Sequence, residues 1–299
     1  MSDKKQFKVI GDSLLVRAPA KINLSLLVAG KRPDGFHEIE TIMAKVNFYD
    51  EILIEKTNEA GIELICKGPL QAPKGKDNLV YKAADMLLRS YSQPSNIRIT
   101  LTKNIPAGAG LGSASSDAAA TLIGLNKFLN LGLSKIQIAE LAAKLGSDVA
   151  FFLDGPSAFC TSRGEKIKKL GQDFSFSALL ILPDISVSTQ KVYANYTHEL
   201  ALYKRLSGQI NGLIEKNRID LVTKICANML EKSCLSLYEQ LAELKAKGES
   251  LGMEPLCLTG SGSAMFWIFQ GKNEKKADEY RRKLEEISCK SIIVRSTRW

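Results

Sequence analysis

The sequence lacks the residues and segments on which several classes of protein depend. Its 299 residues include two histidines and six cysteines, and no two cysteines form a C-x-x-C pair. A zinc site built from cysteine and histidine is therefore excluded. No apolar run approaches the ~18 residues of a membrane span, and the Lys-rich start has no apolar leader segment. We therefore expect no membrane contact, a cytoplasmic location and reduced thiols.

Aromatic side chains are also few, at 7% of the sequence, while 41 basic and 32 acidic residues give a net charge of +9. Positive charge suggests nucleic acid, but nucleic-acid surfaces interleave basic residues with exposed aromatics. Here the aromatics fall largely in apolar runs, and +4 of the surplus lies in residues 281–299. Such a fringe is more typical of a solvated chain end, and we expect no nucleic-acid partner.

A chain of this length with 45% apolar residues can bury the core of one large or two ordinary domains. Patterns of period two predict strands over 7–10, 13–16, 22–28, 51–55, 97–101, 157–161, 178–182 and 291–295, with a break from regular pairing at 18–21 and a strand–loop–strand at 256–269. Patterns of period 3.6 predict helices over 78–90, 117–130, 134–145 and 274–287, the third capped by Ser134. Since these elements mix without strict βαβ alternation, we predict an α+β fold in two domains, 1–168 and 169–299, divided within the charged segment 163–177.

The most unusual stretch follows the strand at 97–101 and precedes the helix at 117–130. It consists of Pro106, Ala107, Gly108, Ala109, Gly110, Leu111, Gly112, Ser113, Ala114, Ser115 and Ser116. Backbone N–H groups of a glycine-rich turn, followed by a helix N-terminus, form a site for a phosphate group. We expect the three glycines to take positive φ, and the three serines to offer hydroxyls to phosphate or Mg²⁺. A flexible linker is the alternative, but it would not normally join a strand to a strong helix pattern.

Several known phosphate loops do not fit this stretch. The Walker A motif is absent, because each Gly-Lys pair is followed by a residue other than Ser or Thr. The dinucleotide fingerprint G-x-G-x-x-G fails at its last glycine, and the H-R-D and D-F-G triplets of protein kinases are missing.

The stretch instead resembles motif 2 of the GHMP small-molecule kinases, a P-x-x-x-G-L-x-S-S type of signature. Two further family motifs occur in the right order, APAKINL at 18–24 and LTGSGSA at 258–264. The resemblance implies an N-terminal domain like ribosomal S5 domain 2, a ferredoxin-like C-terminal domain and an active site in the cleft between them. It also implies that residues 106–116 hold ATP with its Mg²⁺, and it leaves the metal ligands open.

Three segments narrow the resemblance: PAKIN at 19–23, RPDGFH at 32–37 and GSDV at 146–149. They are typical of the GHMP kinases that phosphorylate the 2-hydroxyl of a cytidine diphosphate ester in the non-mevalonate (MEP) route to isoprenoids. The resemblance makes Asp148, expected at the N-terminus of a short helix, the base for the substrate hydroxyl, and pairs Lys21 with it. Judged from spacing alone, Asp148 would be a helix cap and Lys21 a surface charge.

A cytosine offers an edge for hydrogen bonds and a face for stacking. The resemblance makes His37 the reader of that edge, with Phe36 and Tyr193 as stacking partners and Asn23 and Thr189 as polar contacts. It also places a second nest, formed by Gly260, Ser261 and Gly262, against the phosphates and the second substrate. The same chemistry explains part of the positive charge, because two polyphosphate substrates must enter one site.

Three alternatives stay open at this point. The chain could be another GHMP kinase, acting on mevalonate, homoserine or a sugar, although such substrates have no use for the Phe36-His37 pair. It could be an RNA-binding protein, since it is basic and the N-terminal domain resembles an S5 fold. It could also be a nucleotide sensor without catalysis. For the leading hypothesis we expect a monomer or a weak homodimer.

Overall fold

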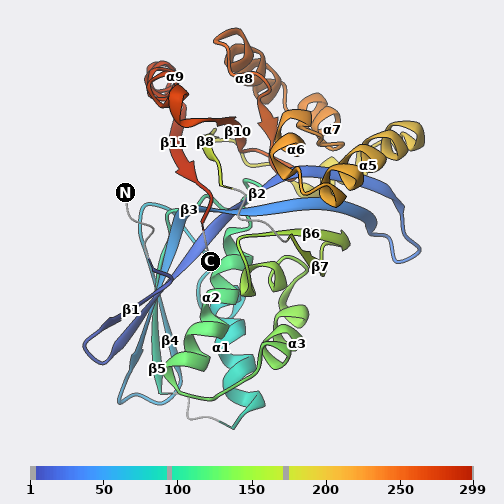
Figure 1. The fold of residues 1–299 in the computed structure, drawn as a ribbon. Coiled ribbons are helices and arrows are strands. Elements are labelled where there is room, and N and C mark those ends of the chain that lie inside the picture. Colours follow the sequence, from blue (N-terminus) through green and yellow to red (C-terminus); the bar gives the residue numbers. More distant parts are fainter. Residues whose placement is uncertain (1–4, 93–95, 171–174, 298–299) are drawn as a thin grey trace.

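The protein forms two β-sheets with flanking helices in a computed structural model that describes residues 5–92, 96–170 and 175–297 (Figure 1). The strands are β1 (Phe7–Ile10), β2 (Ser13–Lys31), β3 (His37–Lys56), β4 (Ile62–Lys67), β5 (Ile97–Thr102), β6 (Ser157–Ser162), β7 (Lys166–Lys169), β8 (Ser177–Leu182), β9 (Cys257–Leu258), β10 (Met265–Phe269) and β11 (Lys290–Arg295). The α-helices are α1 (Leu79–Ser90), α2 (Ser113–Phe128), α3 (Lys135–Leu145), α4 (Thr189–Ala194), α5 (Leu200–Glu215), α6 (Ile219–Ile225), α7 (Glu231–Leu237), α8 (Glu239–Ser250) and α9 (Glu274–Glu286), and the 3-10 helices are η1 (Gly75–Asp77), η2 (Ala150–Leu153) and η3 (Gly271–Asn273).

The first sheet has the strand order β1-β2-β3-β5-β4, with β6 paired to β3 and β7 paired to β6. Helices α1, α2 and α3 lie together against this sheet (Figure 1). Their apolar faces and the strands enclose one core, in which Val16, Ile52, Leu87 and Leu122 are fully buried. The predicted helices at 78–90 and 134–145 are confirmed within a residue, and Ser134 forms a capping box with Gln137.

The second sheet has the order β11-β8-β10-β9 and is antiparallel throughout. Numbered by their place in the C-terminal half, these strands follow the order 4-1-3-2 of the ferredoxin-like fold. Helices α4 to α9 lie in the same half of the molecule as this sheet (Figure 1). The expected α+β architecture, with a ferredoxin-like C-terminal part, is therefore confirmed.

The long β2–β3 hairpin connects the two sheets. The predicted strands at 13–16 and 22–28 and the break between them are one continuous strand, so that prediction is wrong. Pro19 is tolerated because β1 pairs only with residues 13–16, and because the pairing with β3 shifts register between Pro19 and Ala20. The buried apolar residues of the hairpin between Ala20 and Val46, except Met43, belong to the core of the second sheet, whereas Leu14, Val16, Ile52 and Ile54 belong to the first.

Other differences from the sequence analysis concern element ends and the cysteines. Helix α2 begins at Ser113, four residues before the predicted start, because the last glycine of the loop turns the chain directly into the helix. Strand β7 was not predicted, and it places the proposed boundary at 168/169 inside the first sheet; residues 171–174 of the segment 163–177 lie outside the described residues.

The expectation of reduced thiols is wrong at Cys226 and Cys257, which form a disulfide. The fold brings the residue after α6 next to β9, with the two Cα atoms 5.6 Å apart. Within the described ranges no helix has the length and apolar character needed to cross a bilayer.

Candidate active site

The glycine loop, residues 106–112, runs from the end of β5 into the first turn of α2. Gly108, Gly110 and Gly112 have φ angles of +69°, +76° and +68°, as the sequence predicted. Such angles are readily available only to glycine, and they turn successive backbone groups toward one side of the loop. The loop therefore has the backbone form expected of an anion nest at a helix N-terminus.

Residues 258–264, which we call the third motif, pack directly against the glycine loop, although about 150 residues separate the two segments in the sequence. The N–H of Ala264 donates to the Ala109 carbonyl at 3.2 Å, and Thr259 Oγ1 donates to the Gly110 carbonyl at 3.4 Å. Gly260 and Gly262 also have positive φ, as a second nest requires. The two glycine-rich segments thus form the two sides of one site.

Helix α4 is attached to the third motif at its first residue. Thr189 Oγ1 lies 2.8 Å from Ser261 Oγ, and the Ser188 side chain caps the helix by accepting from the Lys191 N–H. Tyr193 lies one turn further along the helix. The fold therefore brings together Thr189, Tyr193 and Ser261, which the sequence analysis had assigned to one substrate.

Lys21 lies buried beneath the glycine loop. Its N–H donates to the Leu111 carbonyl at 2.9 Å, and its Nζ donates to Asn23 Oδ1 at 2.5 Å. A Cβ added at Gly112 would meet Lys21 Cγ at 3.0 Å and the Phe152 ring at 2.8 Å, so this lysine packs tightly under the loop. Burial lowers the pKa of Lys21, and the nearby Asp148 carboxylate acts against this shift.

Asp148 is half-buried in the turn between α3 and η2. The expected helix cap is instead a turn, closed by the Val149 N–H donating to the Gly146 carbonyl at 3.3 Å. A Cβ added at Gly164, in the turn after β6, would lie 3.4 Å from Asp148 Oδ1. Burial and then the charge of Asp148 raise the pKa of Cys160 to about 12, and Asp148 also contributes to a raised pKa at Tyr193. Lys21, Asp148, Cys160 and Tyr193 therefore share one neighbourhood.

Asn23 is held on every side by neighbouring polar groups. Its N–H donates to Thr259 Oγ1 at 3.0 Å, and its Nδ2 donates to Thr41 Oγ1 at 2.8 Å. Together with the bond from Lys21, these contacts fix the amide of Asn23 and link β2 to the third motif. Its role as a contact to substrate stays a prediction.

The two aromatic residues predicted to stack on a base, Phe36 and Tyr193, each contact a different neighbour. The rings of His37 and Tyr193 lie 4.9 Å apart and 30° from parallel, and Tyr196 approaches His37 edge-on at 6.1 Å. Phe36 is 55% exposed and lies under the Arg163 guanidinium at 5.0 Å. The sequence analysis missed Tyr196 and Arg163, because neither belongs to a motif and both reach the site through the fold.

A buried charged cluster beside the glycine loop was also missed. Lys103 Nζ donates to the side chains of Asp50, Ser113 and Asp117, the last at 2.8 Å. Asp50 Oδ1 accepts the N–H groups of Asn104 at 2.6 Å and Ile105 at 2.9 Å. A lysine directly after a strand and an aspartate in the second turn of a helix, on either side of a glycine loop, are the signal that could have found it.

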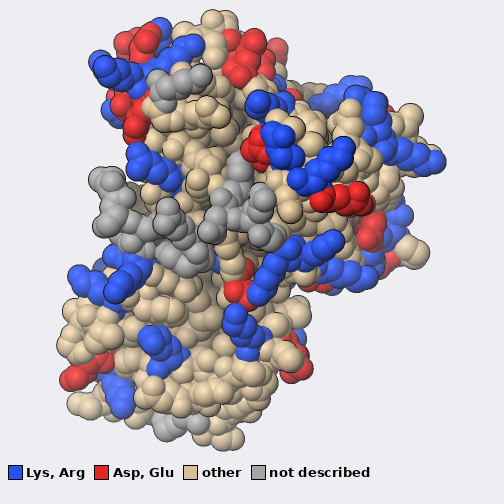
Figure 2. Space-filling model, in the orientation of Figure 1, with Lys and Arg blue, Asp and Glu red and all other residues tan. Residues whose placement is uncertain are grey.

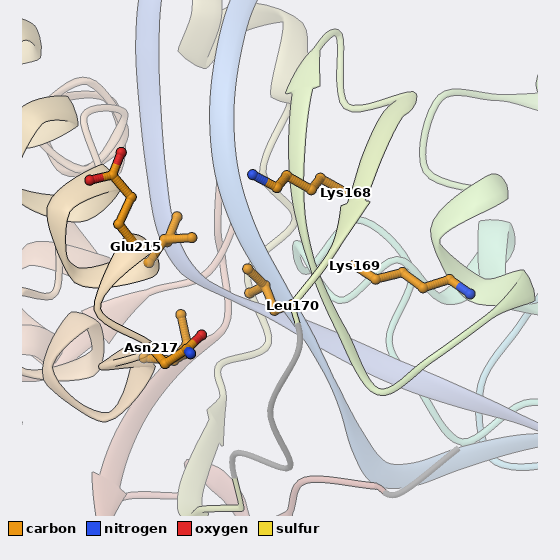
Figure 3. A pocket seen from close by; sticks show the side chains of 7 residues that line it. Lys168, Lys169, Leu170, Glu215 and Asn217 are labelled. Carbon is orange, nitrogen blue, oxygen red and sulfur yellow. The ribbon is translucent and has the colours of Figure 1, made fainter.

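Away from these residues, a surface hollow of about 200 Å³ lies between β7 and the turn from α5 to α6 (Figure 3). Lys168 and Lys169 line it from β7, Glu215 from the end of α5 and Asn217 from the turn that follows. Predicted site residues do not line it. On the face shown in Figure 2, Lys and Arg side chains are interspersed with Asp and Glu over both halves of the molecule and do not form one basic stripe.

Comparison with known proteins agrees with this geometry. Residues 78–156 match the family model of the GHMP kinases N-terminal domain, and residues 210–288 match that of the GHMP kinases C-terminal domain. A curated 4-diphosphocytidyl-2-C-methyl-D-erythritol kinase from Geobacillus sp. (strain WCH70) is 39% identical over 86% of this chain and 88% of its own length. One from Syntrophomonas wolfei is 35% identical over 94% of this chain and 99% of its own length.

Solved structures show the same fold. A crystal structure of 4-(cytidine 5'-diphospho)-2C-methyl-D-erythritol kinase matches with a TM-score of 0.76 at 30% identity, over 94% of this chain and 98% of its own. Homoserine kinase from Cytophaga hutchinsonii also matches with a TM-score of 0.76, but at 21% identity, over 99% of this chain and 98% of its own. This second likeness shows the fold alone.

Proposed function

Because this chain belongs to the GHMP kinases, and within them to the 4-diphosphocytidyl-2-C-methyl-D-erythritol kinases, we propose the following reaction for it. The protein transfers the γ-phosphoryl group of ATP to the 2-hydroxyl of 4-diphosphocytidyl-2-C-methyl-D-erythritol, a step of the MEP route to isoprenoid precursors. The observation that carries the proposal is the placement of Lys21 beneath the glycine loop, in the same neighbourhood as Asp148.

Phosphoryl transfer requires a positioned hydroxyl, an acceptor for its proton and positive charge near the transferred group. In our proposal the 2-hydroxyl oxygen bonds to the γ-phosphorus, the bond from that phosphorus to the β,γ-bridging oxygen breaks, and ADP leaves. Asp148 accepts the hydroxyl proton, and Lys21 stabilises the charge on the transferred group. A half-buried carboxylate and a buried ammonium that influence each other electrostatically support these roles.

We propose that the glycine loop and the first residues of α2, residues 106–116 in all, bind the phosphates of ATP through their backbone N–H groups. Ser115 is partly exposed, and Ser116 Oγ is buried with no hydrogen-bond partner in the described part of the chain. Among the described residues, no group of three or more His, Cys, Asp or Glu side chains lies together in a way that could hold a metal ion. We therefore propose that Mg²⁺ arrives with ATP and that serine hydroxyls and phosphate oxygens hold it.

For the cytidine diphosphate ester we propose that His37 reads the cytosine edge and that Tyr193 stacks on its face. The His37 and Tyr193 rings lie 4.9 Å apart, which supports a contact of both residues with one base. Phe36 and Arg163 would then cover the base from the hairpin side, while Thr189 and the nest at 260–262 hold the rest of the substrate. We propose a monomer or weak homodimer without a nucleic-acid or membrane partner, and the cytoplasmic location stays a prediction.

A coupled assay of ADP formation tests the proposal. Purified protein with Mg²⁺ and ATP should turn over 4-diphosphocytidyl-2-C-methyl-D-erythritol and leave mevalonate and homoserine unchanged. Turnover of mevalonate or homoserine with no reaction of the cytidyl ester would overturn the substrate assignment. ATP binding without turnover of any of the three would favour a nucleotide sensor, and tight salt-dependent binding to bulk RNA with no turnover would favour an RNA-binding protein.

A further inference from the structure

Both ends of the glycine loop are tied to one buried cluster, which consists of Asp50, Lys103, Ser113 and Asp117. We call it the lysine cluster. The side chains of Asp50, Lys103 and Asp117 are 0%, 4% and 4% exposed, so solvent reaches none of them appreciably. The cluster does not include Lys21 or Asp148, and the phosphoryl transfer proposed above makes no use of it.

Asp50 holds the entrance to the loop. Its Oδ1 accepts the N–H groups of Asn104 and Ile105, the two residues before Pro106, and the Asn104 side chain donates to the Tyr49 carbonyl at 3.0 Å. Hydrogen bonds from two successive backbone N–H groups to one buried carboxylate oxygen fix the direction in which the chain leaves β5. The entrance is therefore attached to β3, which forms the centre of the first sheet.

Ser113 and Asp117 hold the exit from the loop. Ser113 is the first residue of α2, and its Oγ donates to Asp50 Oδ2 at 3.0 Å. Asp117 lies one turn later and pairs with Lys103, the residue directly after β5. Lys103 thus connects the residues on either side of the loop, and the same Asp50 contacts both ends.

The cluster contains more acidic than basic groups, since the ammonium group of Lys103 lies beside the carboxyl groups of Asp50 and Asp117. Burial and the charge of Asp50 raise the pKa of Asp117 to about 8, against the opposing effect of Lys103. Burial lowers the pKa of Lys103, but Asp117 and Asp50 outweigh it and the net shift is upward. Asp117 Oδ1 has no hydrogen-bond partner among the described residues, and Cys66 of β4 also faces this carboxyl with a pKa raised by burial. The raised pKa of Asp117 therefore reduces the excess of negative charge in the cluster.

We propose that Lys103, Asp50 and Asp117 are positioning residues that hold the glycine loop in its phosphate-binding form before ATP arrives. The inference rests on the proposed function in one respect, namely that this loop binds the phosphates of ATP. A loop that is already ordered in the free protein loses little conformational entropy when the nucleotide binds. We therefore expect the cluster to affect the affinity for ATP more than the rate of the chemical step.

The test compares Lys103→Met with Leu87→Ala. Leu87 is fully buried in α1 and belongs to the core of the first sheet, whereas Ala109 and Leu111 of the loop belong to the other core, so its truncation serves as a control for lost stability. We expect Lys103→Met to raise the KM for ATP by about tenfold or more, with kcat and the KM for the cytidyl ester changed by less than about threefold. Leu87→Ala should leave both KM values unchanged at a temperature where it is folded.

A second measurement uses the protein without nucleotide. Amide hydrogen exchange of residues 104–112 should become about tenfold faster or more in Lys103→Met, while the amides of β3 keep their protection. If Lys103→Met does not fold, Asp50→Asn replaces it, because an asparagine oxygen can still accept the two loop amides while Lys103 loses one of its two carboxylate partners. Asp50→Asn should give a smaller change in the same direction.

Two results would overturn the proposal: unchanged exchange of the loop amides, or a KM for ATP that stays at the wild-type value in a folded variant. Failure of the proposed function is a separate outcome. In that case the wild-type protein has no kinase activity on the cytidyl ester, whereas the exchange measurement still reports whether the cluster orders the loop.

Discussion

A methyl group added at Gly110 would lie 2.1 Å from the carbonyl oxygen of Thr259, so the glycine loop and the third motif touch at a point where no side chain fits. Residues from the two halves of the sequence therefore form the site together. This contact explains why the loop needs glycine here for space as well as for its positive φ.

The first prediction concerns Gly110→Ala. The variant should lose about 100-fold in kcat/KM, because the loop and the third motif must move apart and the transferred group is then misplaced. Gly208→Ala is the matched control, since Gly208 lies in α5 with open space around its Cα. Steady-state kinetics of both variants measure this loss, and equal kcat/KM values for the two would contradict the close approach of Gly110 to Thr259.

Asp148→Asn tests the proposed base. We expect kcat to fall by about 100-fold or more, since an amide cannot accept the hydroxyl proton, while the affinity for ATP measured by calorimetry stays close to wild type. Asp154→Asn serves as control, because Asp154 is a nearby carboxylate that pairs with Lys135 and Lys169 at the surface. An unchanged kcat in Asp148→Asn would remove Asp148 from the reaction.

His37→Ala tests the reading of cytosine. The KM for the cytidyl ester should rise by about tenfold or more, because the base loses a hydrogen-bonding partner in a partly buried site, while the KM for ATP stays within about twofold. His198→Ala removes the other histidine, which contacts the Tyr196 hydroxyl at 3.4 Å, and should have a smaller effect. A larger loss in His198→Ala than in His37→Ala would exchange the assigned roles.

Titration of the Asp117 carboxyl should make the affinity for ATP depend on pH. Burial and the charge of Asp50 raise its pKa to about 8, so the cluster gains a negative charge above that pH, close to the loop that we propose binds the phosphates of ATP. The KM for ATP should therefore rise roughly fivefold between pH 7 and pH 9.5, which corresponds to about 1 kcal/mol of repulsion. Asp117→Asn should lack this alkaline rise. A variant whose KM for ATP follows the wild-type pH profile would show that another group titrates.

Titration of Lys45 should make the free energy of unfolding depend on pH. It is fully buried, its Nζ donates to the Phe152 carbonyl at 3.1 Å, and burial lowers its pKa to about 7. Between about pH 7 and its ordinary value of 10.5, the unfolded chain binds a proton that the folded chain has released, so stability rises with pH in this window. Lys45→Met should lack that rise and should be more stable than wild type by roughly 1–3 kcal/mol at pH 6.5.

Urea unfolding at pH 6.5 and pH 9.5, followed by tryptophan fluorescence, measures this difference. Lys56→Met, at the exposed end of the same strand, should change stability by less than about 0.5 kcal/mol at both pH values. If the gain of Lys45→Met over wild type is the same at both pH values, Lys45 does not titrate in this window.

The sequence predicted the parts of the fold and site that depend on local pattern. The amphipathic helix at 79–90, the cap at Ser134 and the positive φ of Gly108 follow from neighbouring residues, and so could be found. The continuous β2–β3 hairpin could not, because Pro19 normally ends a strand and is accepted here only where the register shifts.

Contacts between residues far apart in the sequence could not be predicted from the sequence either. The approach of Tyr196 to His37 and the pairing of Lys103 with Asp50 join residues 159 and 53 positions apart, and no local pattern marks them. The motifs identified the loops that carry the chemistry. Only the three-dimensional structure identified the buried charges that support those loops.

The shared β2–β3 hairpin has a consequence for how the chain folds. Its inner part, from Ala20 to Val46, supplies fully buried residues such as Ile22, Leu24 and Ile42 to the core of the second sheet. A fragment that contains only residues 169–299 would expose the apolar surface that these side chains cover, and would lack one wall of its core. The C-terminal half therefore depends on the first fifty residues, and the two halves should unfold in one cooperative transition.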